Sequence, residues 1–227
     1  NITRFWVFAF LFASTMVAGR PARAAFTLGD DDKNLKLSML IQGSGAFLPK
    51  GAPDGESLET DFYLRRMRLL LFGNVTKWVH YFVETDSPNF GKGGNTHVNM
   101  FIQDAWVELN VHPAFMLSVG MILVPFSHHG MQGATSLNAL EYHGALVKYP
   151  RGAHKNWRDW GVMLRGLVAN QRLEYRVALT NGAHGSATDP RNPKDYPRLA
   201  ARLTFNVFES ESGAGASGFF WDGIYLK

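Results

Sequence analysis

The sequence has no cysteine among its 227 residues. This absence excludes a disulfide scaffold and a zinc site built on thiolates. Long apolar runs are also scarce: beyond residues 5–18, no stretch approaches the roughly 18 consecutive apolar residues that suggest a transmembrane helix. The chain does have 23 glycines and 13% aromatic residues, which suits a protein built of strands and turns.

The first 24 residues have the pattern of an export signal. Arg4 precedes the apolar run of residues 5–18, and Ala22 and Ala24 supply small residues before a cleavage site. The run is shorter than the roughly 20 residues that a membrane-spanning helix needs. We therefore expect a secretory signal peptide at residues 1–24. Because the sequence starts at Asn1 rather than at Met, we also expect residues before it.

The charge of the mature chain is close to balanced. The whole sequence has a formal net charge of +4. Removing Arg4, Arg20 and Arg23 with the signal from the 23 basic residues leaves 20, against 19 acidic ones. A nucleic-acid partner is therefore not expected, because such proteins carry a clustered basic surface.

Residues 158–182 contain the clearest strand pattern in the chain. Their second half alternates polar residues with an apolar row, formed by Leu173, Tyr175, Val177 and Leu179. A period of two indicates a β-strand with one apolar face, and residues 169–171 fit a tight turn before it. Two architectures have such a hairpin: a soluble β-sandwich, and an outer-membrane barrel whose apolar face contacts lipid.

The whole chain favours the barrel. We predict nine strands, at residues 35–42, 62–73, 78–86, 98–110, 115–124, 158–168, 172–180, 198–207 and 219–227. Short turns alternate with long loops near residues 50, 90, 140 and 190, as in outer-membrane barrels. An open sheet edge in lipid is not viable. We therefore expect the N-terminal part of an antiparallel up-and-down β-barrel.

The second predicted strand has two possible orientations. We place Arg66 and Arg68 toward the lumen and Tyr63 toward lipid, because an arginine on the lipid face costs about 2–4 kcal/mol at the midplane. Met67, Leu69 and Leu71 then also face lipid. Arg65 falls on the lipid side in this register, so we expect it near a membrane edge.

Several short motifs occur in an order that resembles the phosphate-selective porin O and P family. They are Arg65-Arg66-Met67-Arg68, Gln103-Asp104-Ala105-Trp106-Val107, Val119-Gly120 with Pro125-Phe126, Arg158-Asp159-Trp160-Gly161, Asn181-Gly182 and Tyr225-Leu226-Lys227. The resemblance implies a barrel of about sixteen strands in the bacterial outer membrane, usually a homotrimer. It also implies an arginine-lined lumen for small anionic solutes such as phosphate.

Mapped onto this chain, the resemblance and the predicted strand faces give two sets of candidate residues. The pore-lining set is Lys36, Arg66, Arg68, His80, Glu84, Asp104, Arg165, Arg176, Arg198 and Arg202. The second set lies in the long irregular stretch at residues 125–158, the candidate constriction loop, and comprises His128, His129, Lys148, Arg151, His154 and Lys155. Where the family often has Gln and Lys in the fifth strand, this chain has Met121 and Leu123. That departure also allows another anion, or a wider range of small solutes.

Other chemistry has weaker support. His128 and His129 are adjacent, so on a strand they point to opposite faces and do not share a metal. His80 and Asp104 would be neighbours if the third and fourth strands paired suitably, as a hydrolase pair or as a lumen salt bridge. We expect no cofactor, no metal and no enzyme activity. The alternatives to a porin are a barrel enzyme and a secreted soluble β-sandwich with a binding role.

Overall fold

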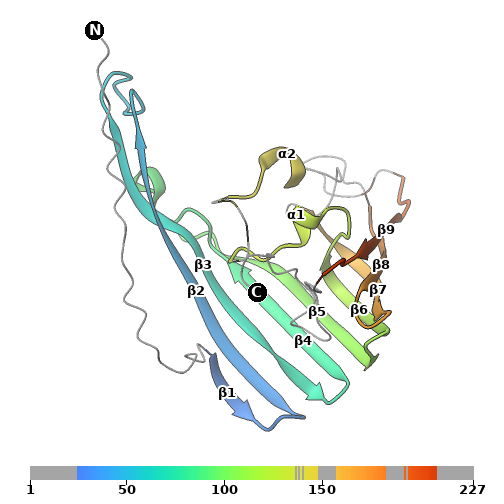
Figure 1. Ribbon diagram of the computed structural model, residues 1–227. Helices are drawn as coiled ribbons and strands as arrows, with labels where there is room; N and C mark the ends of the chain where they lie inside the picture. Colours follow the sequence, from blue (N-terminus) through green and yellow to red (C-terminus); the bar gives the residue numbers. More distant parts are fainter. Residues whose placement is uncertain are drawn as a thin grey trace.

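The computed structural model describes residues 25–135, 137, 139, 141–147, 157–182, 192 and 194–208. Within these residues the fold is all-β, with nine strands in one antiparallel sheet ordered as in the chain (Figure 1). The strands are β1(Ala25–Gly29), β2(Asn34–Leu48), β3(Glu59–Thr76), β4(Val79–Asp86), β5(Phe101–His112), β6(Phe115–Leu123), β7(Arg158–Val168), β8(Leu173–Thr180) and β9(Arg198–Phe205). Three short helices are η1(Lys92–Gly94), α1(His128–Met131) and α2(Gly144–Val147).

Eight of the predicted strands are present, from β2 to β9. β1 was not predicted; it pairs with β2 through a turn in which Asp30 accepts hydrogen bonds from the backbone of Asp32 and Lys33. The predicted strand at 219–227 and the predicted signal peptide lie outside the described residues. Each described strand except β1 and β9 pairs with two neighbours, so the sheet is open, as expected for part of a barrel.

Connection lengths alternate as predicted. β3 and β4 are joined by two residues and so are β5 and β6, whereas residues 49–58 and 87–100 form long connections. This places short turns at one end of the sheet and long loops at the other. No helix in the described part of the chain has the length and apolar character needed to cross a membrane.

The β2–β3 hairpin is longer than predicted and extends beyond the other strands at the upper left of Figure 1. The sequence predicts a strand at residues 35–42, but β2 continues through Gly43 and Gly45 to Leu48. Gly45 pairs with Phe62, whose ring lies over the place of the missing side chain and makes an edge-to-face contact with Phe47 at 5.7 Å. An aromatic neighbour therefore supplies the packing that the glycine lacks.

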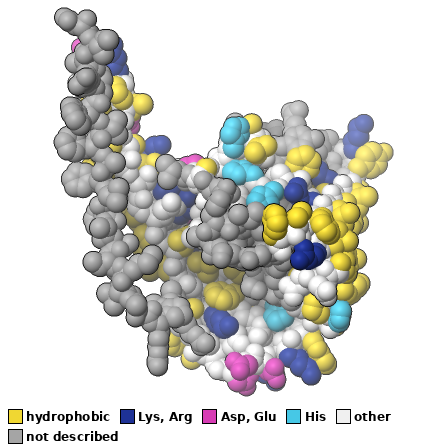
Figure 2. Space-filling model, in the orientation of Figure 1, with side chains coloured by type: hydrophobic (Ala, Val, Ile, Leu, Met, Phe, Trp, Pro, Cys, Tyr) yellow, Lys and Arg dark blue, Asp and Glu magenta, His cyan; other side chains and the backbone are white. Residues whose placement is uncertain are grey.

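The convex face of the sheet is an exposed apolar surface. In the row predicted from residues 173–179, Val177 is 39% exposed and Leu179 is 46% exposed. In Figure 2, hydrophobic side chains gather on the right, where Figure 1 shows β7, β8 and β9. A soluble sandwich would cover this face with a second sheet; the described strands instead form one sheet and leave it open.

Exposed aromatic side chains lie toward the strand ends of the same face. Trp78, Phe115 and Phe205 are near the short turns, and Phe62 and Trp160 are near the long loops. Aliphatic residues such as Val119 and Val177 lie between them. Two aromatic belts around an apolar band are typical of a barrel in a bilayer.

Away from the β3–β4 and β5–β6 turns, where the register also shifts, two β-bulges interrupt the alternation of the concave face. On β3, Arg65 and Arg66 together oppose Gln42, so the register shifts by one residue. On β5, Gln103 and Asp104 together oppose Glu84. A bulge turns two consecutive side chains toward one face. The predictions for Arg65 and Tyr63 were therefore wrong: Arg65 bonds to a loop on the concave side, and Tyr63 lies opposite the inward Ser44.

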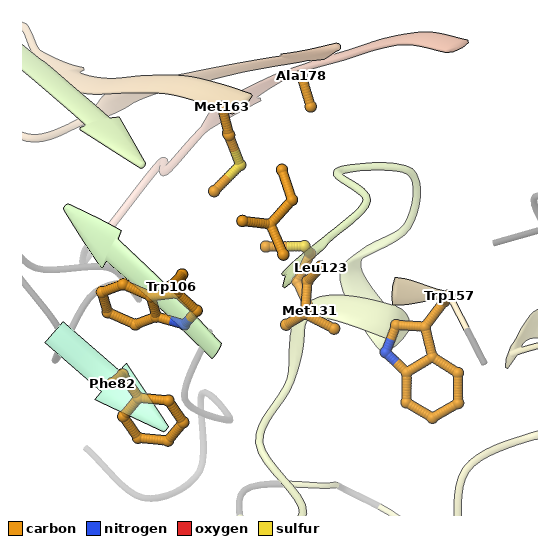
Figure 3. Close-up of a cluster of buried hydrophobic side chains, with 8 residues drawn as sticks. Phe82, Trp106, Leu123, Met131, Trp157, Met163 and Ala178 are labelled. Atoms are coloured by element: carbon orange, nitrogen blue, oxygen red, sulfur yellow. The ribbon is translucent and has the colours of Figure 1, made fainter. Parts of the chain in front are cut away.

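The concave face also holds a buried apolar cluster that seats the 125–158 segment. Met131 of α1 lies beside Leu123, with Trp157 close by (Figure 3). Phe82 and Trp106 stack at 5.5 Å, and with Leu123, Met163 and Ala178 they belong to the part of the cluster that comes from the sheet. Ser127 caps α1 by accepting a hydrogen bond from the Gly130 backbone. The described part of this segment therefore folds into the concavity, which the sequence did not reveal.

Candidate functional site

All ten candidate pore-lining residues lie on the concave face. Residues opposite each other in an antiparallel ladder share a face. The register therefore relates each strand, pair by pair, to Phe82 and Trp106, which lie in the concave cluster with Met131 of α1. Lys36 is opposite Phe72, which is opposite Phe82. The same alternation gives the concave face Arg66, Arg68, His80, Glu84, Asp104, Arg165, Arg176, Arg198 and Arg202.

Carboxylates hold Arg68 of β3 in the centre of this face. Arg68 forms ion pairs with Glu84 at 2.5 Å and with Asp86 at 3.0 Å. The amide of Gln103 fits between them, donating to Asp86 at 3.0 Å and accepting from Arg68 at 2.8 Å. All of these side chains are buried, so their charges are matched locally and polar groups from the bulge complete the set.

Arg158 forms the same kind of pair from the start of β7. Its guanidinium makes two hydrogen bonds to Asp104, at 2.8 and 2.9 Å. Two parallel bonds are the strong geometry for an arginine and a carboxylate. We had expected Arg158 only as the first residue of a strand, because its partner lies 54 positions away in the sequence.

Arg165 and Arg176 are fully buried and paired as well. Arg165 contacts both carboxylate oxygens of Glu108, at 2.7 and 2.8 Å, and Ser118 donates to the same carboxylate. Arg176 lies 2.6 Å from Glu174. Carboxylates thus offset the charges of both arginines, and neither Glu108 nor Glu174 is among the candidate pore-lining residues.

Three arginines nevertheless stand directly opposite one another across β7, β8 and β9. Arg165 is paired in register with Arg176, and Arg176 with Arg202. Arg202 donates hydrogen bonds to the Phe126 carbonyl at 3.2 Å and to Thr204 at 3.3 Å. We call Arg165, Arg176 and Arg202 the arginine row. Like charges in this arrangement repel one another, and Glu108 and Glu174 offset the charges of Arg165 and Arg176 within the row.

The 125–158 segment is tied to the β3 bulge through Glu141. Arg65 makes two hydrogen bonds to this carboxylate, at 2.5 and 2.8 Å, and Arg66 adds one at 2.9 Å. Burial raises the pKa of Glu141, but the hydrogen bonds and charges of the two arginines outweigh it and hold the pKa below the ordinary value. Glu141 is the only acid between residues 125 and 158, which was the available hint for this contact.

Tyr142 continues the attachment on the apolar side. Its hydroxyl donates to the Gln132 carbonyl at 2.7 Å, and its ring lies 4.9 Å from the ring of Trp157. Burial raises the pKa of Tyr142, so the hydroxyl keeps its proton and remains a donor. One face of the segment is thus fixed by charge and the other by aromatic packing.

The constriction-loop candidates are only partly described. His128 and His129 lie in α1 rather than on a strand, and His129 Nε2 accepts a hydrogen bond from the His143 backbone at 2.8 Å. Burial lowers the pKa of His129. The other candidates, Lys148, Arg151, His154 and Lys155, lie outside the described residues. Within the described ranges, no group of His, Cys, Asp and Glu is arranged to hold a metal ion.

The hydrolase pair does not form. His80 is opposite Glu108, whereas Asp104 is opposite Glu84 and is held by Arg158. His80 instead contacts Asn74 at 2.6 Å. The register between the two strands could not be derived from their residues, and the register decides which side chains meet.

The two positions that depart from the family pattern are packed with apolar neighbours. Leu123 is fully buried in the cluster around Met131, and Met121 lies between Ala105 and Trp160 in the register. Both side chains are buried, and of the two Leu123 belongs to the apolar cluster that packs on α1.

Comparison with known proteins agrees with the geometry. Comparison with curated proteins gave no match. A family model described as phosphate-selective porin O and P matches residues 48–214, which include the strands from β3 to β9 and both bulges. With an open antiparallel sheet, an apolar convex face and a charged concave face, the chain belongs to the phosphate-selective porin O and P family and is an outer-membrane porin.

Proposed function

We propose that this porin is a passive diffusion channel that prefers small anions and passes phosphate among them. The observation that carries the proposal is the arginine row, in which the partly exposed Arg202 adjoins the buried Arg176 and Arg165 on three adjacent strands of the concave face. Positive groups along a water-filled lumen lower the barrier for anions and raise it for cations.

The preference should be moderate rather than strict. Glu108 and Glu174 lie against two members of the row, and on the β3–β5 side Arg68 is shared by Glu84 and Asp86. Leu123 brings an apolar side chain where the family often has a polar one. These features support a channel for several small anions over one reserved for phosphate.

The proposal includes the remaining candidate residues. The ten residues of the pore-lining set form the wall of the lumen, and the 125–158 segment narrows it through α1 and its basic residues. The attachment of this segment by Glu141 and Met131 supports that role. We further propose export directed by residues 1–24 and assembly as a homotrimer in the outer membrane.

Conductance in planar bilayers tests the proposal. The full-length protein is inserted into a bilayer with a potassium chloride gradient, and the reversal potential is measured. We expect open channels whose reversal potential lies on the anion side, and a phosphate current when phosphate replaces chloride. A cation preference, or bilayers that remain closed, would contradict it.

A further inference from the structure

A second site lies apart from the arginine row, in a pocket of about 240 Å³ between the bulged strands and the 125–158 segment. We call it the Arg68 pocket. Its polar lining comes from β3, β4, β5 and β7, and its aromatic lining from Phe101, Tyr142 and Trp157. At roughly 30 Å³ for each water in the liquid, the pocket has room for a molecule much larger than one water.

The charges around the Arg68 pocket are balanced. Four arginines line it, and each lies against a carboxylate: Arg65 and Arg66 against Glu141, Arg68 against Glu84 and Asp86, and Arg158 against Asp104. Four carboxylates thus face four guanidiniums. An added dianion would bring two charges that these pairs do not neutralise, at a high cost in a buried site. The pocket therefore suits a ligand without net charge.

Two buried polar atoms on the pocket-lining side chains are available for hydrogen bonds to a ligand. They are Nε of Arg68, a donor, and Oδ1 of Asp86, an acceptor; among the described residues neither has a hydrogen-bond partner. Arg68 is 7% exposed and Asp86 4% exposed. Leaving such groups unsatisfied is costly. One hydroxyl group can bond to both atoms, because it accepts one hydrogen bond and donates another.

From these observations we propose that the Arg68 pocket binds a small neutral polyol of monosaccharide size. Its hydroxyls bond to Arg68 and Asp86, and its carbon–hydrogen faces pack on the aromatic side chains. Aromatic walls with a few convergent polar groups are the usual composition of a small-molecule site. The porin thus has two solute-binding sites: the arginine row for anions and the Arg68 pocket for an uncharged sugar.

Glucose is the probe, and the test has two readouts. In bilayers, glucose is added to open channels and the block of the chloride current is followed. In detergent, Trp157 beside the pocket provides a fluorescence change that requires no channel activity. We expect a saturable effect of glucose in both, and a weak, non-saturating one from a polyethylene glycol of similar size, which lacks a row of hydroxyl donors.

Asp86→Asn and Glu174→Gln are a matched pair of variants, each replacing a buried, paired carboxylate by its amide. Asp86→Asn weakens glucose binding about tenfold through the loss of a hydrogen bond to a charged group, whereas Glu174→Gln leaves it unchanged. Should Asp86→Asn fail to fold, Phe101→Leu removes one wall of the pocket and also weakens glucose binding, with the exposed Phe205→Leu as its control.

Several results would overturn the sugar site. If glucose and the polymer act alike, the pocket holds only water. If Asp86→Asn and Glu174→Gln behave the same, binding occurs elsewhere; if phosphate displaces glucose, the pocket is an anion site. Failure of the channel itself would appear as absent chloride current while the fluorescence titration still reports on the pocket.

Discussion

The two sides of the concave face use arginine differently. On β3–β5, which we call the bulged half, each bulge brings a second polar side chain inward, and Arg68 is enclosed by Glu84 and Asp86. On β6–β9, the regular half, the ladders run in continuous register and Arg176 stands between two other arginines. In the bulged half one arginine is thus shared by two carboxylates, whereas in the regular half Arg165 and Arg176 each hold one carboxylate and also face another arginine.

The largest expected effect comes from removing the central cation of the bulged half. Arg68→Met leaves Glu84 and Asp86 buried without it, and breaking a buried pair in this way costs about 3–5 kcal/mol of unfolding free energy. In the regular half, Arg202→Met removes the hydrogen bonds to the Phe126 carbonyl and to Thr204, at about 1 kcal/mol each, and we expect the smaller loss because Arg202 is partly exposed. Denaturant unfolding in detergent micelles measures both; equal losses would contradict the contrast.

Ion selectivity should respond more to a change in the regular half than to one in the bulged half. Arg202→Glu places a negative charge beside Arg176 and should shift the anion-to-cation permeability ratio several-fold toward cations, because a unit charge at 4 Å is worth about 1 kcal/mol even in water. The reversal potential in a salt gradient measures this ratio. Leu203→Gln, the next residue on the convex face, is the control and should leave the ratio as it was.

A smaller effect is expected where the loop meets the bulged half. Glu141→Gln removes the charge that holds Arg65 and Arg66, so we expect larger and noisier single-channel conductance as the segment loosens. The loss of stability should stay below about 1 kcal/mol, because the Glu141 side chain is 43% exposed and such pairs are weak. Glu56→Gln, an exposed turn position, changes the same charge and should leave the conductance as in the unaltered protein.

The smallest effect is a pH dependence of the same contact. The pKa of Glu141 in the folded protein lies below its ordinary value of 4.5. The contact is therefore fully present above pH 4.5 and is lost as the pH falls through the lower, folded pKa. Conductance recorded at decreasing pH should rise only below 4.5. The same rise in Glu141→Gln would show that another group is responsible.

The sequence predicted the regular half best, because alternation is all that this half requires. The row from Leu173 to Leu179 faces outward as expected, and Arg176 and Arg202 face inward. Arg65 could not be placed, since a bulge depends on the partner strand and leaves the composition unchanged. β1 was missed because five residues directly after an expected cleavage site carry too short a pattern.

Contacts between residues far apart in the sequence limit how much of the site could be predicted. The concave placement of the ten candidate residues could be predicted from strand faces, whereas the pairs Arg158–Asp104 and Arg65–Glu141 join residues 54 and 76 positions apart. The inward fold of the 125–158 segment depends on Met131 entering an apolar cluster, and an isolated methionine in a loop gives no sign of that.

The apolar packing of α1 determines how the 125–158 segment responds to ionic strength. Dissolved ions screen the contact between Glu141 and the two arginines, but they do not weaken the packing of Met131 against Leu123 and Trp157. As ionic strength rises, we therefore expect the link between Glu141 and the two arginines to weaken while α1 stays packed in place, with no covalent change.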